Sequence, residues 1–442
     1  MKKRFSILSI ILTVSLLIAI TCSPDNRDSH VEKSIRKTER CKVSPSITYE
    51  IFIPDFNSRC SDLPLLVSID PQGDSEFALE KFKKAAQYFH CIILSTDKIK
   101  NRSLEYVSIL NTILNDVKDK YPVDETIFLA GFSGGARMAM NYAQYYPVDG
   151  IISCGALNTS DQIKEIHSPI ISVAGMADFN FIEAAQYVFN PEQAPPNLNL
   201  SFTSNTHEWP SSNELLYALG LLFLHQNDKT ICLTSKKSIA AYMKSQNVRF
   251  DSLIKANNLF EAGLLARNLA KIEKTSFTSK LESIEYNTNF NNELNRLRES
   301  IRFELTVRNA YYQALSEENQ KWWETEIYSL NRSIVEEKDP YRNFALLRIK
   351  GYLGIMCYSL CNNSLRQDDM VAAERLLSIY RIIEPENPDM LYFSALFAYK
   401  TEHSDRVKEL LLKAIQAGFT DKDILQEDFP EELILPLLAN MS

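Results

Sequence analysis

The sequence predicts an α/β fold, with a mainly parallel sheet covered by helices, followed by an all-helical second domain. Between about residues 45 and 228, short runs of β-branched residues alternate with amphipathic helical stretches, a rhythm typical of parallel strands joined by crossover helices. From residue 229 to 442 the strand-like runs stop, and long helical periodicities with charged faces take over. Seven of the twelve glycines fall between Gly73 and Gly175, which indicates that tight turns are concentrated in the first domain.

The chain is long enough for two domains, because 442 residues exceed the usual domain size of about 100–200. Its net charge of −8 is spread without a long basic run, which excludes the electrostatic footprint of a nucleic-acid-binding protein. The patterns predict strands at residues 46–54, 63–70, 91–96, 126–130, 150–154, 169–174 and 198–203, and helices near residues 76–89, 103–120, 135–145 and 212–225.

The N-terminus resembles an export signal. Basic residues 1–4 precede an apolar run at 5–20, which is shorter than the ~20 residues of a transmembrane helix. The sequence Ala-Ile-Thr-Cys that ends at Cys22 resembles a bacterial lipobox, although a lipobox usually has Leu at its first position and Gly or Ala before the cysteine. We expect residues 1–22 to be a lipoprotein signal peptide that anchors the protein to the bacterial cell envelope through Cys22. Simple signal cleavage and a retained anchor are the alternatives. The polar residues 23–44 would then form a flexible tether.

The seven other cysteines follow no disulfide or metal pattern. Export would permit disulfides, but the number is odd and the spacings suggest no framework. Cys41 and Cys60 are a conceivable bridge. Cys357 and Cys361 would share one face of a helix, where core packing is the expected role. No metal site and no cofactor are predicted.

The helical domain contains a degenerate repeat. Ala373 aligns with Val407 at a spacing of 34 residues. Residues 387–419 resemble a tetratricopeptide repeat, with a small side chain at Ala395 where paired helices approach closely. The repeats are clearest at residues 354–420, and a generic helical bundle is the alternative. Because stacked repeats commonly hold other proteins, this domain is a candidate for binding a protein partner.

The pentapeptide Gly-Phe-Ser-Gly-Gly, centred on Ser133, is predicted to be a nucleophile elbow. The sharp turn that exposes such a serine has no room for bulky side chains two residues before and after it, and Gly131 and Gly135 meet this requirement. A strand pattern leads into the turn and a helical pattern leaves it. The start of that helix would present the N–H group of Gly134 to a developing oxyanion. This context predicts a serine hydrolase of the α/β-hydrolase type, and a turn with an incidental serine is the alternative.

A second oxyanion donor is expected from the loop after the strand at residues 63–70. Pro71 has no N–H group, so the backbone N–H of Gln72 or Gly73 is the candidate. An ordinary Pro/Gly turn is the alternative.

The catalytic base and acid should follow the serine in the order acid, then histidine. Of the six histidines, His207 alone lies in a loop directly after a late strand, so it is the predicted base. Asp178 follows the strand at residues 169–174 and is the predicted acid, which would fix the tautomer of the imidazole. Asp161 is the rival, and Glu183 or Glu208 would fit less comfortably.

Three motifs together resemble one branch of the α/β-hydrolases, the polyhydroxybutyrate depolymerases and feruloyl-esterase-like enzymes. They are Gly-Phe-Ser-Gly-Gly-Ala-Arg-Met-Ala at 131–139, Gly-x-x-Asp at 175–178 and Thr-His-Glu-Trp-Pro at 206–210. The resemblance spans residues 45–225. It implies carboxylester hydrolysis through an acyl-enzyme, with Ser133, Asp178 and His207 as the triad. The chain departs from the family at Thr206, where Gly is common, and in an oxyanion loop that is poorer in Gly and His.

We therefore expect an exported, membrane-anchored serine hydrolase that cleaves a small or polymeric ester without a cofactor. A serine peptidase is one alternative, because the same triad cleaves amides. A catalytically degenerate scaffold, whose repeat domain binds a protein, is another. No long insertion interrupts the predicted sheet, so we expect an open cleft.

Overall fold

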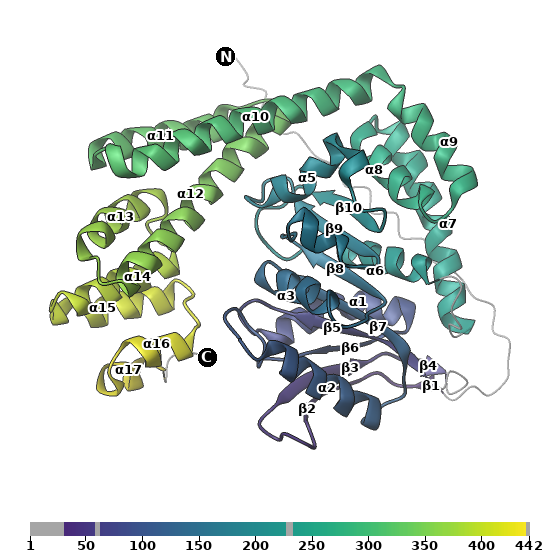
Figure 1. Ribbon diagram of the computed structural model, residues 1–442, viewed down its shortest axis with the longest axis horizontal. Helices are drawn as coiled ribbons and strands as arrows, with labels where there is room; N and C mark the ends of the chain where they lie inside the picture. The colour runs from purple at the N-terminus through teal and green to yellow at the C-terminus, as the bar shows by residue number, and fades with distance from the viewer. Residues whose placement is uncertain (1–30, 58–61, 227–232, 439–442) are drawn as a thin grey trace, which may run out of the picture.

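The computed structural model describes residues 31–57, 62–226 and 233–438 (Figure 1). The predicted signal peptide, the lipidation site Cys22 and the Cys60 half of the conceivable bridge lie outside these residues. The remaining part of the predicted tether is structured from Ile35 to Arg40, where the chain forms an edge strand. Five of its six side chains are exposed, which explains why its composition resembled that of a tether.

Eight strands form one sheet in the order β10-β9-β8-β7-β5-β6-β3-β2. Strand β3 runs antiparallel to both of its neighbours, and every other pair in the sheet is parallel. This is the sheet of the α/β-hydrolase fold. A separate antiparallel pair joins β1 (Val31–Glu32) to β4 (Phe56–Asn57). The sheet strands are β2 (Ile35–Arg40), β3 (Thr48–Ile53), β5 (Leu63–Ile69), β6 (Ile92–Ser95), β7 (Val123–Phe132), β8 (Gly150–Cys154), β9 (Ile170–Gly175) and β10 (Leu198–Thr203).

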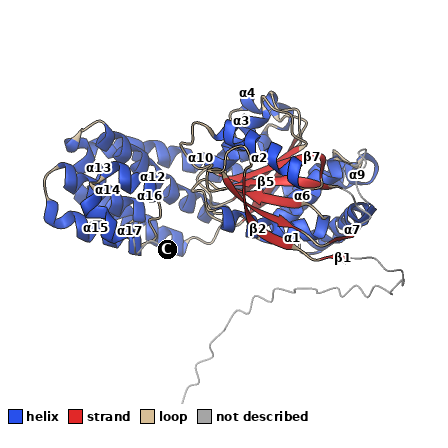
Figure 2. Cartoon of the chain, turned by 90° about the horizontal axis from the view of Figure 1, so that it is seen from below, coloured by secondary structure: helices blue, strands red, loops and turns tan. Residues whose placement is uncertain are grey.

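Helices cover both faces of this sheet, with α1 (Ser75–Phe89) and α6 (Ser212–His225) on one face and α2 (Tyr106–Lys120) and α3 (Gly134–Ala143) on the other (Figure 2). Every residue of β5, β6, β8 and β9 is buried, as expected for parallel strands covered on both sides. The ring of Phe223 stacks on that of Phe89 with centroids 4.8 Å apart, which joins α6 to α1. Two shorter helices, α4 (Ser160–Lys164) and α5 (Phe181–Phe189), precede β9 and β10.

The C-terminal half is helical throughout its described residues, and Asn or Asp side chains mark where most of its helices begin. Such side chains accept backbone N–H groups that the first helical turn leaves unpaired. The capped helices are α8 (Leu259–Ala270, Asn258), α10 (Thr288–Glu317, Asn287), α11 (Gln320–Glu336, Asn319), α12 (Pro340–Arg366, Asp339), α13 (Met370–Ile383, Asp369), α14 (Pro388–Lys400, Asn387) and α16 (Lys422–Asp428, Asp421). The others are α7 (Leu233–Lys255), α9 (Lys274–Glu285), α15 (Ser404–Gln416) and α17 (Glu431–Leu438).

The hydrophobic cores do not separate at residue 229, where the sequence pattern changes. The core of the sheet continues through α7, α8 and α9 and ends at Ile301 in α10, whereas the second core begins at Tyr311 in the same helix. Helix α10 therefore belongs to both cores. In Figure 1 it leads away from the sheet to the helices that curve back toward the loops of the first domain.

The outer edge of β10 is closed by a side chain of α8. Asn268 accepts the N–H of Leu200 at 3.2 Å and donates its amide to the carbonyl of the same residue at 2.8 Å. Lys271, one turn further on, donates to the carbonyl of Leu198. These side chains take the place of a neighbouring strand at this point of the edge.

The residues predicted as repeats form parts of two helix pairs, α12 with α13 and α14 with α15. Ala395, Leu411 and Ala414 are buried where α14 and α15 meet. The assignment to tetratricopeptide repeats stays a prediction. Among the described helices, α12 is long and apolar enough to cross a membrane by length and composition alone, and half of that stretch is buried inside the fold.

The partly buried histidine at the end of α6, His225, is expected to make a pH-dependent contribution to stability. The side-chain nitrogen of Asn199 lies 3.3 Å from Nε2 of His225. Burial, with a smaller effect of Lys271, lowers the pKa of His225 to about 4. The unfolded chain, where the pKa of histidine is about 6.5, therefore binds more protons between these two values. Stability is lost as the pH falls through this window.

We expect the substitution His225→Gln to reduce this loss. Between pH 7 and pH 4.5 the free energy of unfolding of the wild type should fall by on the order of 2 kcal/mol more than that of the variant. Urea unfolding at the two pH values measures the difference. His403→Gln, at the start of α15, is the control and should lose as much as the wild type. An equal loss in His225→Gln and the wild type would contradict the assignment.

Candidate active site

Ser133 lies at the apex of a sharp turn between β7 and α3. Its backbone has φ +51° and ψ −116°, a conformation that L-residues rarely adopt and that folded structures hold mainly at functional sites. The Ser133 N–H donates to the carbonyl of Cys154 in β8 at 2.8 Å, and its carbonyl accepts the N–H of Arg137 in α3 at 3.2 Å. The turn is thus held by the sheet on one side and by the helix on the other.

Close backbone contacts explain both flanking glycines. A Cβ atom on Gly131 would overlap the carbonyl group of Gly135, and a Cβ on Gly135 would overlap the carbonyl oxygen of Ile69 in β5. No other residue fits either position without moving the backbone. The spacing in the sequence therefore reports the geometry of an elbow that presents the serine side chain at the carboxyl ends of the strands.

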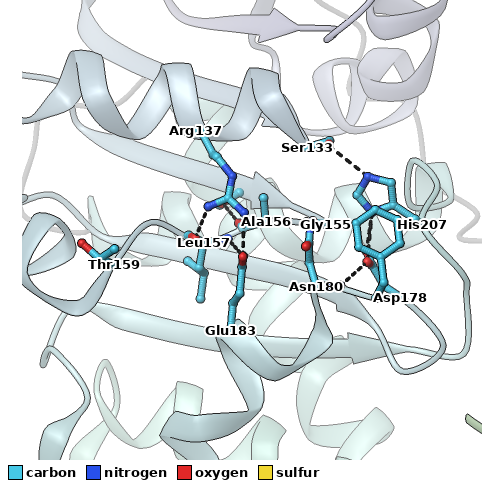
Figure 3. A network of polar contacts seen from close by, with 12 residues as sticks. Ser133, Arg137, Gly155, Ala156, Leu157, Thr159, Asp178, Asn180, Glu183 and His207 are labelled. Carbon is cyan, nitrogen blue, oxygen red and sulfur yellow. Dashed lines mark hydrogen bonds and ion pairs between the residues drawn. The ribbon is translucent and has the colours of Figure 1, made fainter. Parts of the chain in front are cut away.

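The structure brings Ser133, His207 and Asp178 into one hydrogen-bonded chain (Figure 3). Oγ of the serine lies 2.9 Å from Nε2 of the imidazole, and Nδ1 lies 2.9 Å from each carboxylate oxygen of the aspartate. The carboxylate is 1% exposed and the imidazole 20% exposed. Solvent thus reaches the imidazole, which contacts the serine, more than it reaches the carboxylate.

The rival acids lie elsewhere. Asp161 is almost fully exposed in α4, and Glu208 is exposed beside the histidine. Glu183 in α5 pairs with Arg137 at 2.6 Å and accepts the N–H of Leu157 at 2.7 Å, and Arg137 also donates to the carbonyl of Leu157 at 2.5 Å (Figure 3). This clamp lines a polar hollow of about 480 Å³ one helical turn from Ser133, together with Asn141, Asn158, Thr159, Ser160, Gln162 and Gln186.

The loop after β9 fixes the aspartate. Oδ1 of Asp178 accepts the N–H of Asn180 at 2.8 Å, and the Asn180 side chain donates to the carbonyl of Gly155 at 2.9 Å. Gly155 has φ +65°, and a Cβ there would lie 2.6 Å from the ring of Phe132 and 3.1 Å from Oδ2 of Asp178. A glycine is needed here for both its conformation and its size.

Aromatic rings hold the histidine loop. The imidazole of His207 lies between Phe132 and Phe179, with ring centroids 4.7 Å and 4.2 Å away. Two residues later, the indole N–H of Trp209 donates to Oδ2 of the buried Asp70 at 2.8 Å. Asp70 directly follows β5, so one carboxylate connects the histidine loop to the proposed oxyanion loop.

Asp70 also accepts hydrogen bonds from both backbone N–H groups that were predicted as second oxyanion donors. The N–H of Gln72 donates to Oδ1 of Asp70 at 2.8 Å, and the N–H of Gly73 donates to the carbonyl of Asp70 at 3.2 Å. Both groups serve the turn, so an oxyanion would have to compete with Asp70 for either of them.

Sequence reasoning missed Asn101, whose carboxamide lies directly against Gly134. A Cβ on that glycine would overlap Oδ1 of Asn101 and would lie 2.9 Å from its Cγ. The backbone N–H of Asn101 donates to the carbonyl of Pro71 at 2.8 Å, which ties this loop to the loop after β5. Asn101 lies in the polar loop between β6 and α2. This loop contains no recognisable motif, so nothing in the sequence predicted a role for Asn101.

The helical region contacts the loops on two sides of this site. Arg308 and Arg348 donate to carbonyls of the loop that carries Asp178, and Lys100, next to Asn101, pairs with Asp423 in α16. The open cleft expected from the sequence is therefore bordered by distant helices, which follow the sheet in sequence instead of interrupting it. Within residues 31–57, 62–226 and 233–438, no group of three His, Cys, Asp or Glu side chains could hold a metal ion.

Comparison with known proteins finds solved structures that are similar to part of this chain. No protein-family model matches the chain, and no curated protein matches its sequence. Est1E from Butyrivibrio proteoclasticus is 14% identical with a TM-score of 0.35, over 44% of this chain and 99% of that one. The esterase domain of a Rhodothermus marinus protein is 13% identical with a TM-score of 0.32, over 42% and 94%. The acylaminoacyl peptidase of Pyrococcus horikoshii is 14% identical with a TM-score of 0.35, over 45% and 42%. The functional assignment therefore rests on the geometry of the site.

We expect Gly155→Ala to destabilise the fold by about 3 kcal/mol, because it adds backbone strain and a contact with Phe132 and Asp178. Gly418→Ala is the matched control, since Gly418 also has positive φ but no atom within 4 Å of its would-be Cβ. It should cost only the backbone strain of about 1–2 kcal/mol. Urea unfolding measures both, and equal costs would argue against the crowding at Gly155.

Proposed function

We propose that the protein is a serine hydrolase that cleaves carboxylic esters through an acyl-enzyme on Ser133. The observation that carries this proposal is the chain of hydrogen bonds from the strained Ser133 through His207 to the buried Asp178. A serine hydroxyl is a weak nucleophile by itself, and a neighbouring base held by an acid is the arrangement that activates it.

In the proposed reaction Oγ of Ser133 attacks the ester carbonyl while its proton passes to Nε2 of His207. Asp178 holds Nδ1–H and stabilises the positive charge of the imidazolium. The imidazolium then gives its proton to the departing alcohol, which leaves an acyl group on the serine. A water molecule gives a proton to Nε2 as it attacks the acyl carbonyl, and return of that proton to Oγ releases the carboxylic acid. The proton transfers of this cycle involve only these side chains, the substrate and water.

For the oxyanion we propose the N–H of Gly134 as the first donor. It stands at the start of α3, where the helix dipole also favours negative charge. Asn101 is the proposed second donor, because turning its carboxamide about χ2 exchanges the oxygen against Gly134 for the NH2 group. The N–H groups of Gln72 and Gly73 are already bonded to Asp70.

The polar hollow that begins at Arg137, one helical turn from Ser133, supports a substrate with a polar portion. Its amide and hydroxyl groups include those of Asn141, Asn158 and Thr159. Arg137 and Glu183 in its wall neutralise each other, so we propose uncharged, hydrogen-bonding groups as the part of the ester that binds there.

The Ser133→Ala variant tests the nucleophile. We expect a fluorophosphonate probe to label the wild type and not the variant, and hydrolysis of p-nitrophenyl esters to fall by about 10³-fold or more, because the acyl-enzyme can no longer form. Ser108→Ala, an exposed serine of α2, is the control and should behave like the wild type.

A wild-type protein that is folded but reacts with neither the probe nor the esters would sink the proposal. Peptide p-nitroanilides, measured beside the esters, distinguish an esterase from a peptidase. We expect the ester to be cleaved with the larger kcat/KM, and preference for the anilide would reassign the substrate class.

Asn101→Ala tests the second oxyanion donor, because it removes the NH2 group without placing a charge beside the oxyanion. We expect kcat to fall about 10²-fold with KM changed little, since the lost hydrogen bond forms only as charge develops. Glu105→Gln, in the same connection, is the control. Wild-type kcat in Asn101→Ala would exclude the side chain as a donor, and a separate loss in Asp70→Asn would then favour the loop after β5.

A further inference from the structure

Two arginines of the helical region bind the backbone on either side of Asp178. Nη1 of Arg348 in α12 donates to the carbonyl of Met176 at 2.5 Å, and Nη2 of Arg308 in α10 donates to the carbonyl of Phe179 at 2.9 Å. These two carbonyls bracket the aspartate in the chain. The loop that carries the proposed catalytic acid is thus held by residues 129 and 172 positions later.

The charges of this cluster are balanced only when Asp178 is included. Glu304 in α10 lies between the arginines, 2.5 Å from Arg308 and 2.6 Å from Arg348. Glu304 and Arg348 are fully buried, and Arg308 is 12% exposed. Two arginines against one glutamate leave a surplus positive charge in a nearly dry region, where an unbalanced charge costs several kcal/mol. The buried Asp178 carboxylate supplies the compensating negative charge.

Electrostatics and packing support the same connection. Burial lowers the pKa of both guanidinium groups, and Glu304 and Asp178 oppose that shift. The guanidinium of Arg308 lies 4.3 Å from the ring of Tyr352, which limits its freedom to leave the cluster.

Helix α12 also packs against Phe179, the aromatic residue that contacts His207. A Cβ on Gly351 would lie 3.4 Å from the ring of Phe179, which places α12 directly against this side chain. The ring of Phe179 in turn lies against the imidazole of His207. Both members of the acid–base pair therefore depend on surfaces that the helical region provides.

We infer that Arg308 and Arg348 are positioning residues for Asp178, so that the helical region is a working part of the active site. This inference rests on the proposed hydrolase function. It assigns the region a role that a protein-binding module would not have. The two guanidinium groups fix the loop from Met176 to Phe179 and hold the carboxylate at the distance from Nδ1 that orients the base.

Full-length Arg308→Ala tests this role, because Arg308 is the more accessible of the two. We expect kcat per active site, titrated with the fluorophosphonate probe, to fall about 10- to 100-fold while KM stays within about threefold, as for a small misplacement of a catalytic group. Arg308→Lys, which keeps the charge, should recover part of the loss. Millimolar guanidinium should also restore part of the activity of Arg308→Ala, because it can occupy the vacated site beside the Phe179 carbonyl.

Arg296→Ala is the matched control. Arg296 lies in the same helix, but its ion-pair partner is Asp339, which lies outside the acid loop, and its side chain is 46% exposed. Its variant should keep wild-type kcat and show no response to guanidinium.

The outcomes separate the two proposals. If the wild type reacts with the probe and Arg308→Ala keeps its kcat per titrated site, losing only melting temperature, the positioning role is overturned and the hydrolase function stands. If the wild type does not react with the probe, the hydrolase function itself has failed. Should Arg308→Ala not fold, Arg308→Gln is measured in the same way, and a kcat equal to the wild type would again overturn the inference.

Discussion

Asp178 places a carboxylate where the chain leaves almost no access to water, and a charge in such a place must be held by hydrogen bonds and opposite charges. The hydrogen bonds come from the backbone of Asn180 and from His207, and the opposite charge comes from the arginine cluster of the helical region. Gly155 is a glycine because the carboxylate and the Phe132 ring need its space. Much of the architecture at this edge of the sheet follows from keeping this one group in place.

The local parts of the site could be predicted because their causes are local. The spacing of Gly131 and Gly135 around Ser133 reports an elbow that no larger residue fits, and this requirement is visible in five residues. His207 and Asp178 could be found from their places after two strands, because parallel strands deliver their loops to the same edge of a sheet. The structure brings these three residues together, and their catalytic roles remain proposals.

The missed parts depend on contacts that no short pattern records. Strand β2 is exposed along nearly its whole length, so its residues resemble a linker. Asn101 gains its position only when two loops meet at Gly134. Arg308 and Arg348 lie in helices where a charged residue usually faces water, and nothing near them in the sequence points to a loop 129 or 172 residues earlier. The competition of Asp70 for Gln72 and Gly73 is likewise a matter of side-chain placement within the turn.

Asn268 closes the edge of β10 with the same pair of hydrogen bonds that another strand would make at Leu200. A fragment that ends at residue 228, where the sequence pattern changes, would lose this side chain together with α7, α8 and α9. The outer strand would then offer free backbone groups and an apolar flank to neighbouring molecules, the usual starting point of edge-to-edge aggregation. Insoluble material from such a fragment would say nothing about the proposed hydrolysis. A cut intended to preserve the sheet belongs beyond Ile301, which is the last fully packed member of its core, and a cut beyond Tyr341 would also keep the last side chain that packs against that core.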